Sequence, residues 1–214
     1  MEPANHGHIE GDTKPLNVEQ RAQQHLEKTG ALKSGHFQLT SGLHSDRYCQ
    51  CAALFERPSI AEEVARMLAT RIPDEERVGT VLTPAIGGII WGYELARQLG
   101  ARSLFAERQP GEKFVLRRGF TLTKGERVLL AEDVITTGKS VAELIPLVED
   151  AGAMVVGFAA IADRSRGGFR PPLPVYTLAT LDFQTWEPAN CPLCREGIPI
   201  HKPGSRMEKQ NSTA

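Results

Sequence analysis

A short run of acidic, hydroxyl and glycine residues near the middle of the chain has the order expected of a site for a phosphorylated ligand. An apolar strand predicted at residues 127–131 leads directly into Glu132 and Asp133. A loop at residues 136–138, Thr-Thr-Gly, then precedes a helix expected to begin at about Ser140. Ligands of open α/β sheets bind beyond the carboxyl ends of the strands, and backbone N–H groups at such a loop bind phosphate. The glycine permits the tight turn and a close approach of the backbone.

The two carboxylates are compatible with this phosphate if it belongs to a sugar. Glu132 and Asp133 would then accept hydrogen bonds from ribose hydroxyls while the phosphate lies one turn further along the chain. For the acids alone, a solvated strand end is the better interpretation; for the whole run 128–140, we favour the ligand site. The run is not a Walker loop, because Gly-x-x-x-x-Gly-Lys-Ser is missing.

A basic segment at residues 107–124 interrupts the regular alternation of strands and helices. It carries Arg108, Lys113, Arg117 and Arg118. Its length and polarity predict a mobile hairpin that acts as a lid over a site.

The elements that must position these residues alternate between strands and helices of about a dozen residues. This alternation predicts an α/β fold with a central, mostly parallel twisted sheet flanked by helices. The strands are expected at 78–84, 103–106, 127–131, 154–161 and 175–181, and the helices at 88–99 and 140–150.

The N-terminal part follows a different pattern. Asn17 and Gln20 predict a helix that begins with a capping box, and residues 36–51 predict strands around the turn Ser41-Gly42. A second capping box is expected at residues 59–62. Residues 1–15 are interpreted as a flexible arm, and 188–214 are expected to wrap the surface or fray.

Composition limits the class of protein. The chain has 214 residues, 41% of them hydrophobic, which suits one globular domain, and its formal net charge is −1. This charge argues against a general nucleic-acid or membrane-surface binder. Residues 1–15 resemble neither a signal nor a transit peptide, so a cytoplasmic location is expected.

The four cysteines predict reduced thiols. Cys191-Pro-Leu-Cys194 has the spacing of half a zinc site, to which His201 could add a third ligand, but a structural zinc normally needs four. A plain turn is the favoured interpretation, and we assign no residue as a metal ligand.

Several segments resemble one family. Residues 128–140 resemble the phosphoribosyl pyrophosphate (PRPP) signature of type I phosphoribosyltransferases. Residues 36–48, His-Phe-Gln-Leu-Thr-Ser-Gly-Leu-His-Ser-Asp-Arg-Tyr, are similar to the N-terminal hood of orotate phosphoribosyltransferases, and 83–89 resemble their pyrophosphate-side loop. Residues 117–120, 191–199 and 202–205 look like one bacterial branch of that family. The resemblance spans roughly residues 17–205. Many members carry Lys within the segment equivalent to 39–42 and Tyr-Lys where this chain has Ile86-Gly87.

The resemblance implies a domain at 16–205, with a small hood at about 16–55, the mobile lid at 107–124 and a flexible tail at 206–214. It implies that PRPP is bound by Glu132, Asp133, Val134, Ile135, Thr136, Thr137, Gly138, Lys139 and Ser140. Orotate contacts are implied for Thr136, Arg164 and Tyr48, and catalytic roles for Asp133, Arg108, Lys113 and Arg117. Arg164 also has a physical rationale, because it follows a buried strand and its guanidinium suits a planar carboxylate.

The implied activity is transfer of the phosphoribosyl group from PRPP to orotate in UMP biosynthesis, with Mg²⁺ as cofactor and a homodimer as the working form. Two alternatives stay open: a phosphoribosyltransferase for a purine base, and a non-catalytic regulator that senses PRPP. Such a regulator would be expected to carry a basic DNA-binding segment, which the sequence lacks.

Overall fold

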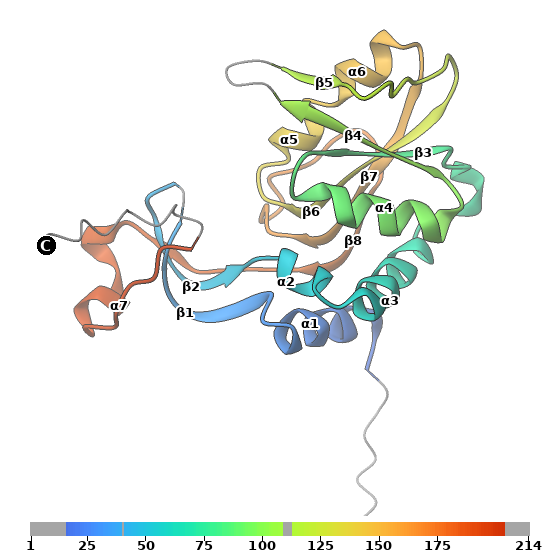
Figure 1. Ribbon diagram of the computed structural model, residues 1–214. Coiled ribbons are helices and arrows are strands. Elements are labelled where there is room, and N and C mark those ends of the chain that lie inside the picture. The colour runs from blue at the N-terminus through green and yellow to red at the C-terminus, as the bar shows by residue number, and fades with distance from the viewer. Residues whose placement is uncertain (1–15, 40, 109–112, 204–214) are drawn as a thin grey trace, which may run out of the picture.

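A six-stranded sheet forms the centre of the molecule (Figure 1). The computed structural model describes residues 16–39, 41–108 and 113–203, so the predicted arm at 1–15 and tail at 206–214 lie outside the described residues. The strand order is β5-β4-β3-β6-β7-β8, with β5 antiparallel to β4 and all other neighbours parallel. The predicted mostly parallel α/β sheet is confirmed. Its strands are β3 (Thr80–Pro84), β4 (Arg102–Arg108), β5 (Phe114–Leu116), β6 (Arg127–Ile135), β7 (Met154–Asp163) and β8 (Val175–Thr180).

Helices cover both faces of this sheet and enclose two separate cores. The first core contains side chains of α1 (Val18–Lys28), α3 (Pro58–Ala69) and α4 (Gly88–Leu99). The second contains side chains of α5 (Lys139–Ala142) and α6 (Ile145–Asp150). Successive strand residues alternate between the two, since Leu129 lies in the first core and Leu130 in the second. The central strands are therefore buried on both faces, as their continuous apolar sequences require.

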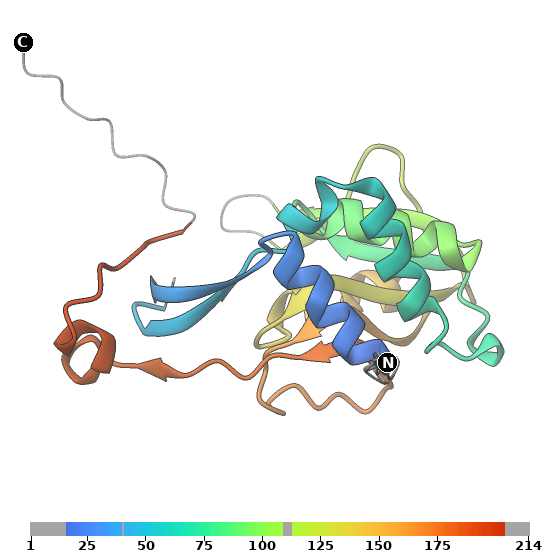
Figure 2. The same ribbon diagram turned by 90° about the horizontal axis from the view of Figure 1, so that it is seen from below.

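A smaller sheet forms the hood, and it draws on segments far apart in the sequence. β1 (Leu32–Gln38) pairs with β2 (His44–Cys49), which pairs in turn with β9 (Thr185–Trp186). The chain beyond β9 runs along the hairpin to α7 (Pro192–Arg195), which lies at the end away from the main sheet (Figures 1 and 2). We use "hood" for β1, β2, β9 and α7. The hood expected at about 16–55 thus gains a strand and a helix from the C-terminal part. Short elements are α2 (Ala52–Phe55) and two 3₁₀ turns, Asp74–Glu76 and Pro188–Asn190.

One of the two predicted helix caps is confirmed. Asn17 accepts a hydrogen bond from the Gln20 N–H at 2.9 Å, and the Gln20 side chain accepts one from the Asn17 N–H at 3.0 Å. The capping box expected at residues 59–62 is wrong. The N-cap is Arg57 and not Ser59, and the helix begins at Pro58, whose fixed φ and missing N–H suit the first helical position.

Two predicted boundaries around the acidic run also need correction. β6 continues through Glu132 and Asp133 to Ile135, because β7 is long enough to pair with it up to Ile135↔Asp163. The helix expected at 140–150 is two pieces, α5 and α6. Pro146 explains the break, because it cannot donate a hydrogen bond and its ring collides with the preceding turn. Among the described residues, no helix is long and apolar enough to cross a membrane.

Candidate active site

The loop after β6 and the residue after β7 lie side by side at the carboxyl edge of the sheet. β6 and β7 are parallel neighbours, and the Arg164 N–H donates a hydrogen bond to the Ile135 carbonyl at 2.8 Å. Thr136 and Thr137 follow Ile135 directly and are exposed. Residues that are nearly thirty positions apart therefore face one space at the edge where α/β proteins bind ligands.

This space is a cavity of about 220 Å³. Its wall contains two predicted PRPP or orotate residues, Thr136 and Thr137, together with Arg164. The remaining lining residues are Leu39, Arg166, Phe183 and Thr185. The hood supplies Thr185 from β9, so the cavity lies between the hood and the main sheet.

Arg164 is partly buried and carries its charge into this cavity. Burial lowers the pKa of its guanidinium, an effect opposed by the nearby Cys49 and Tyr48. Its Cζ atom lies 5.3 Å from the centre of the Phe183 ring, within cation–π range. A guanidinium held against an aromatic face has its N–H groups fixed in direction, as recognition of a planar carboxylate requires.

Phe183 is a site residue that was not predicted from the sequence. Phe183 is only 2% exposed and follows β8 by three residues. Its position just past the strand beside β7 is the signal that could have found it, since parallel strands end at the same edge.

Gly138 is required by two independent features of the loop. Its φ is +71°, in the left-handed region that favours glycine. A Cβ atom at this position would also lie 1.9 Å from the Phe169 side chain. Phe169 packs edge-on against the buried Phe158 ring, with centroids 5.1 Å apart. The second core thus determines the path of the loop.

The two acids of β6 point to opposite faces of the sheet, because they are adjacent residues of one strand. Glu132 follows the alternation of the second core, and its side chain hydrogen-bonds Ser140 on α5. Burial and the neighbouring Asp133 charge raise the pKa of Glu132 to about 7, although the Ser140 bond lowers it. Asp133 faces the other way, towards the start of α4. Its carboxylate lies 3.9 Å from the position that a Gly87 Cβ would take.

Burial also raises the pKa of Asp133, against the lowering effect of the Val134 N–H, which donates to Oδ1 at 2.9 Å. The carboxyl is thus partly shielded from solvent beside the Gly87 backbone.

The loop facing Asp133 joins β3 to α4 and contains a cis peptide between Ala85 and Ile86. This loop lies close to the sheet, because α4 packs closely against β3 at its glycine residues. A Cβ at Gly92 would meet Thr83 Cγ2 at 2.3 Å. The backbone of Gly87 thus lies close to the Asp133 carboxylate.

Tyr48 does not line the cavity that contains Arg164. Its hydroxyl donates to Gln50 Oε1 at 2.9 Å, and its ring packs 5.7 Å from the Phe37 ring in the hood. Arg164 and Asp133 both act on its pKa, which burial raises overall. Tyr48 is thus near the site in this conformation but borders a different hollow, beneath the hood.

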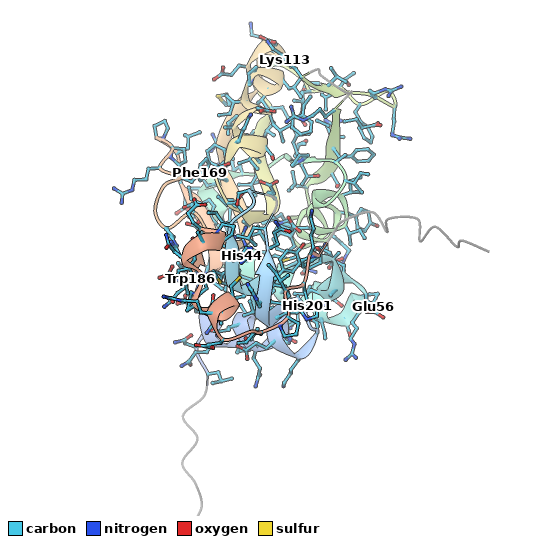
Figure 3. All side chains as sticks on the ribbon, turned by 90° about the vertical axis from the view of Figure 1, so that its left-hand side faces the viewer. His44, Glu56, Lys113, Phe169, Trp186 and His201 are labelled. Carbon is cyan, nitrogen blue, oxygen red and sulfur yellow. The ribbon has the colours of Figure 1, made fainter. Side chains whose placement is uncertain are left out.

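The basic segment forms the β4–β5 hairpin, in which Ala106 pairs with Leu116. Its cations are held by acids outside the cavity. Arg108 forms an ion pair with Glu143 at the end of α5, and Arg117 and Arg118 lie 4.0 Å and 2.8 Å from Glu107. Lys113 precedes β5 and is exposed. Figure 3 shows Lys113 at the end of the molecule away from the hood residues His44 and His201. None of these cations is among the described residues that line the cavity of Arg164.

Comparison with known proteins places this geometry in a family. The model of the phosphoribosyl transferase domain matches residues 50–193, which include the acidic run, its loop and Arg164. The orotate phosphoribosyltransferase of Desulforamulus reducens is 51% identical over 180 residues, which are 84% of this chain and 93% of that protein. The chain belongs to the orotate phosphoribosyltransferase family.

Two further members of the orotate phosphoribosyltransferase family support this assignment. The Thermotoga maritima protein is 51% identical over 181 residues, 85% of this chain and 96% of its own length. The crystal structure of orotate phosphoribosyltransferase from Aeropyrum pernix is 29% identical with a TM-score of 0.64, covering 75% of this chain and 93% of that one. The predicted family and fold are both confirmed.

Proposed function

We propose that the protein transfers the 5-phosphoribosyl group of PRPP to orotate, which gives orotidine 5′-phosphate and pyrophosphate in pyrimidine biosynthesis. The observation that carries this proposal is the common cavity of Thr136, Thr137 and Arg164. It places a fixed cation, suited to a carboxylated base, beside a threonine-glycine loop suited to a phosphate. Membership of the family supports the same reaction.

In this proposal the loop and its flanks hold the ribose 5-phosphate. The backbone N–H groups of residues 136–140 donate hydrogen bonds to the phosphate at the turn around Gly138. The Thr and Ser hydroxyls add further donors. Glu132 and Asp133 accept hydrogen bonds from the ribose hydroxyls. Because these two side chains lie on opposite faces of the sheet, they bracket the sugar and fix its C1 atom towards the base.

Arg164 binds the orotate carboxylate, and Thr136 binds the edge of the same base. Two parallel N–H···O bonds from a guanidinium set both the position and the plane of the ligand. Tyr48 closes the base side when the hood moves towards Arg164. Such positioning supplies much of the barrier reduction in a reaction between two bound substrates.

The reaction breaks the bond from ribose C1 to pyrophosphate and forms a bond from C1 to the base nitrogen. Positive charge develops on the sugar ring, as in glycoside transfer, and negative charge on the leaving pyrophosphate. The buried Asp133 carboxylate stabilises the developing cation, while the Gly87 and Gly88 backbone and the cations of the β4–β5 hairpin stabilise the anion. The hairpin also excludes water from the sugar cation.

Mg²⁺ fits this site, because it prefers oxygen ligands and usually combines one or two carboxylates with substrate phosphates. Asp133, which faces the Gly87 backbone, is the carboxylate that would hold it, directly or through its waters. When bound with PRPP, the ion neutralises charge on the leaving pyrophosphate.

A homodimer is part of the proposal. Ile86, Ile90 and Tyr93 form an apolar patch at the start of α4, and their exposures are 86%, 56% and 62%. Large apolar side chains gathered in one place on a surface mark a binding face. A second copy packed there would adjoin the Gly87 backbone. It would also bring a second hairpin near the site, with Arg108, Lys113 and Arg117 available in trans.

An absorbance assay tests the activity directly. Incubation with Mg²⁺, orotate and PRPP is expected to consume orotate, and replacement of orotate by adenine or hypoxanthine is expected to give no product. No loss of orotate removes the proposal. Turnover of a purine base instead would support the alternative enzyme, and PRPP binding without any turnover would support a sensor.

We predict that Arg164→Ala raises the KM for orotate about 10- to 100-fold, because a charge-assisted hydrogen bond contributes about 1.5–3 kcal/mol. The KM for PRPP should change much less. Arg170→Ala is the matched control, since Arg170 lies on the same loop and bonds the Gly167 carbonyl at 2.7 Å. Steady-state kinetics with each substrate varied in turn gives both constants. An unchanged orotate KM in Arg164→Ala would rule out its proposed role.

A further inference from the structure

Four metal-binding side chains converge within the hood, away from the proposed substrate cavity. They are His36 of β1, His44 at the start of β2, Cys191 at the N-cap of α7 and Cys194 within it. One ligand atom from each lies within 4.8 Å of all the others. His36, His44 and Cys191 are buried, and Cys194 is exposed. The proposed reaction uses none of them.

Most of the known distances between these atoms match the edges of a coordination tetrahedron. His36 Nε2 lies 2.9 Å from His44 Nδ1 and 3.5 Å from Cys191 Sγ. Cys194 Sγ lies 3.3 Å from His44 Nδ1 and 3.7 Å from His36 Nε2. Zinc bonds of about 2.0–2.1 Å to nitrogen and about 2.3 Å to sulfur put ligand atoms roughly 3.3–3.8 Å apart in a tetrahedron. Three of the four distances fall in this range, the distance between the two histidine nitrogens is shorter, and all four atoms lie within 4.8 Å of one another. The group is therefore compact enough to hold a single ion.

The hydrogen bonding of His36 prepares its ring for a metal. Its Nδ1 lies 2.8 Å from the Ile198 carbonyl oxygen. A carbonyl only accepts, so Nδ1 carries the proton and Nε2 presents a lone pair to the other three ligand atoms. A backbone carbonyl that orients a histidine in this way is the usual outer partner of a metal ligand. A simple hydrogen-bond network explains the group less well, since one lone pair at Nε2 would serve three neighbours.

We propose that His36, His44, Cys191 and Cys194 bind one structural zinc ion. Two thiolates and two imidazoles favour zinc over magnesium or calcium. Four protein ligands also close the coordination shell, which is the mark of a structural and not a catalytic site. His201, which the sequence offered as a third ligand, lies outside this group. Its N–H instead donates to the His36 carbonyl at 2.8 Å.

The ion would join segments that are 155 residues apart. It fixes the β1–β2 hairpin to the chain that returns through β9 and α7. Strand β2 of this hairpin also contains Tyr48. Leu39, which follows β1, lines the proposed substrate cavity. Zinc thus holds the hood in the position from which it closes the base side of the cavity.

Metal analysis of the whole purified chain tests the proposal. Protein purified under reducing conditions is expected to contain one zinc per chain by plasma mass spectrometry. After removal by a chelator, Co²⁺ should restore one ion per chain, with the thiolate charge-transfer band and strong d–d bands of a tetrahedral cobalt site.

Variants identify the ligands. His44→Asn and Cys194→Ser should lose the stoichiometric metal and the cobalt spectrum, and Cys194→Ser is the milder change because Cys194 is exposed. His201→Asn is the matched control and should keep both the metal and the cobalt spectrum.

Thiol accessibility gives a further test. Zinc should protect two of the four thiols from a thiol reagent until a chelator is added, since Cys49 and Cys51 lie outside the site.

Three results would overturn the proposal. One is a reduced native chain that contains no zinc and takes up no stoichiometric Co²⁺. Another is full metal retention in both His44→Asn and Cys194→Ser. The third is loss of metal in His201→Asn with retention in His44→Asn, which would mean a different ligand set.

Discussion

At the scale of single residues, the alternation of side chains along β6 gives two adjacent carboxylates different surroundings. Glu132 faces the second core and Ser140, whereas Asp133 faces Gly87 and the start of α4. Both are partly buried, and burial is the largest cause that raises each pKa. A cation that pairs with either side chain would lower these values, so the site as it stands favours a ligand that brings hydroxyl groups or positive charge.

We predict that Glu132→Gln stabilises the ligand-free protein at pH 8 and has little effect at pH 5. The folded protein keeps the Glu132 proton up to about pH 7, whereas an unfolded chain releases it near pH 4.3. The folded state binds more protons between these values, so its stability falls as pH rises through that window. Allowing for partial solvent screening, the gain at pH 8 is about 1–2 kcal/mol, or about 2–6 °C in Tm.

Thermal unfolding at the two pH values measures this difference. Glu149→Gln, an exposed carboxyl on α6, is the control and should show no pH-dependent gain. A Tm for Glu132→Gln that is equal to or below that of the parent at pH 8 would contradict the prediction. The same variant should bind PRPP more weakly, because the amide replaces a carboxylate acceptor.

At the scale of elements, close packing of α4 on β3 sets the position of the pyrophosphate-side loop. The helix approaches so closely that Gly92 has no room for a Cβ beside the Thr83 methyl group, and Gly88 has little, with Thr83 Cβ at 3.0 Å. The loop at 85–87 leads directly into this helix, so the position of the helix sets the distance of the loop from the sheet.

We predict that Gly92→Ala destabilises the protein by about 1–3 kcal/mol, as overpacking of a tight contact does. It should also raise the KM for PRPP, because α4 must move and carry the loop with it. Thr83→Ser removes the Cγ2 atom that the new methyl group would meet. The double variant should therefore recover most of the lost stability, as measured by urea unfolding. Equal stability of Gly92→Ala and the parent would show that the helix moves without cost.

The elements that could be predicted from sequence are those with several turns or a long apolar run. Apolar periodicity and a terminal glycine located α4, and continuous apolar residues located β7. The predictions failed where one residue overrides the pattern, as Pro58 does at the start of α3 and Pro146 does between α5 and α6. The two-residue strand β9 could not be predicted, because its pairing with β2 depends on contacts across about 140 positions.

The candidate site was predictable to a similar degree. Thr136 and Arg164 follow strands, so topology alone brings them to one edge. Phe183 follows β8 and could have been found by the same topological argument. The contact between His36 and His44 depends on the irregular register of β1 and β2, which the sequence pattern did not reveal.

At the scale of the whole molecule, the cations of the β4–β5 hairpin and Arg164, which we propose binds orotate, belong to different parts of the chain. Arg108 and Arg117 are held by Glu143 and Glu107, and Lys113 lies away from the hood. A dimer formed through Ile90 and Tyr93 would resolve this separation, if each subunit completes the site of the other.

We predict that two impaired variants restore each other when they are assayed at an orotate concentration well below the KM of Arg164→Ala. Arg164→Ala and Lys113→Ala homodimers, mixed and allowed to exchange subunits, should give about a quarter of the parent activity. Half of the dimers are then mixed, and each mixed dimer has one intact site. Initial rates before and after exchange measure this recovery. Ile90→Glu in both partners should abolish both the recovery and the dimer seen by analytical ultracentrifugation. Recovery that stays at the level of the separate variants would mean that the hairpin acts within its own chain.

The origin of the hood in two distant segments has a consequence for synthesis of the protein. β2 needs β9 as its outer neighbour, and His36 needs the chain around Ile198. A nascent chain that has emerged only as far as β8 can assemble its six-stranded sheet, but its first hairpin still lacks these partners. Released fragments that end before residue 185 should therefore protect the sheet amides from hydrogen exchange and leave those of residues 32–49 open.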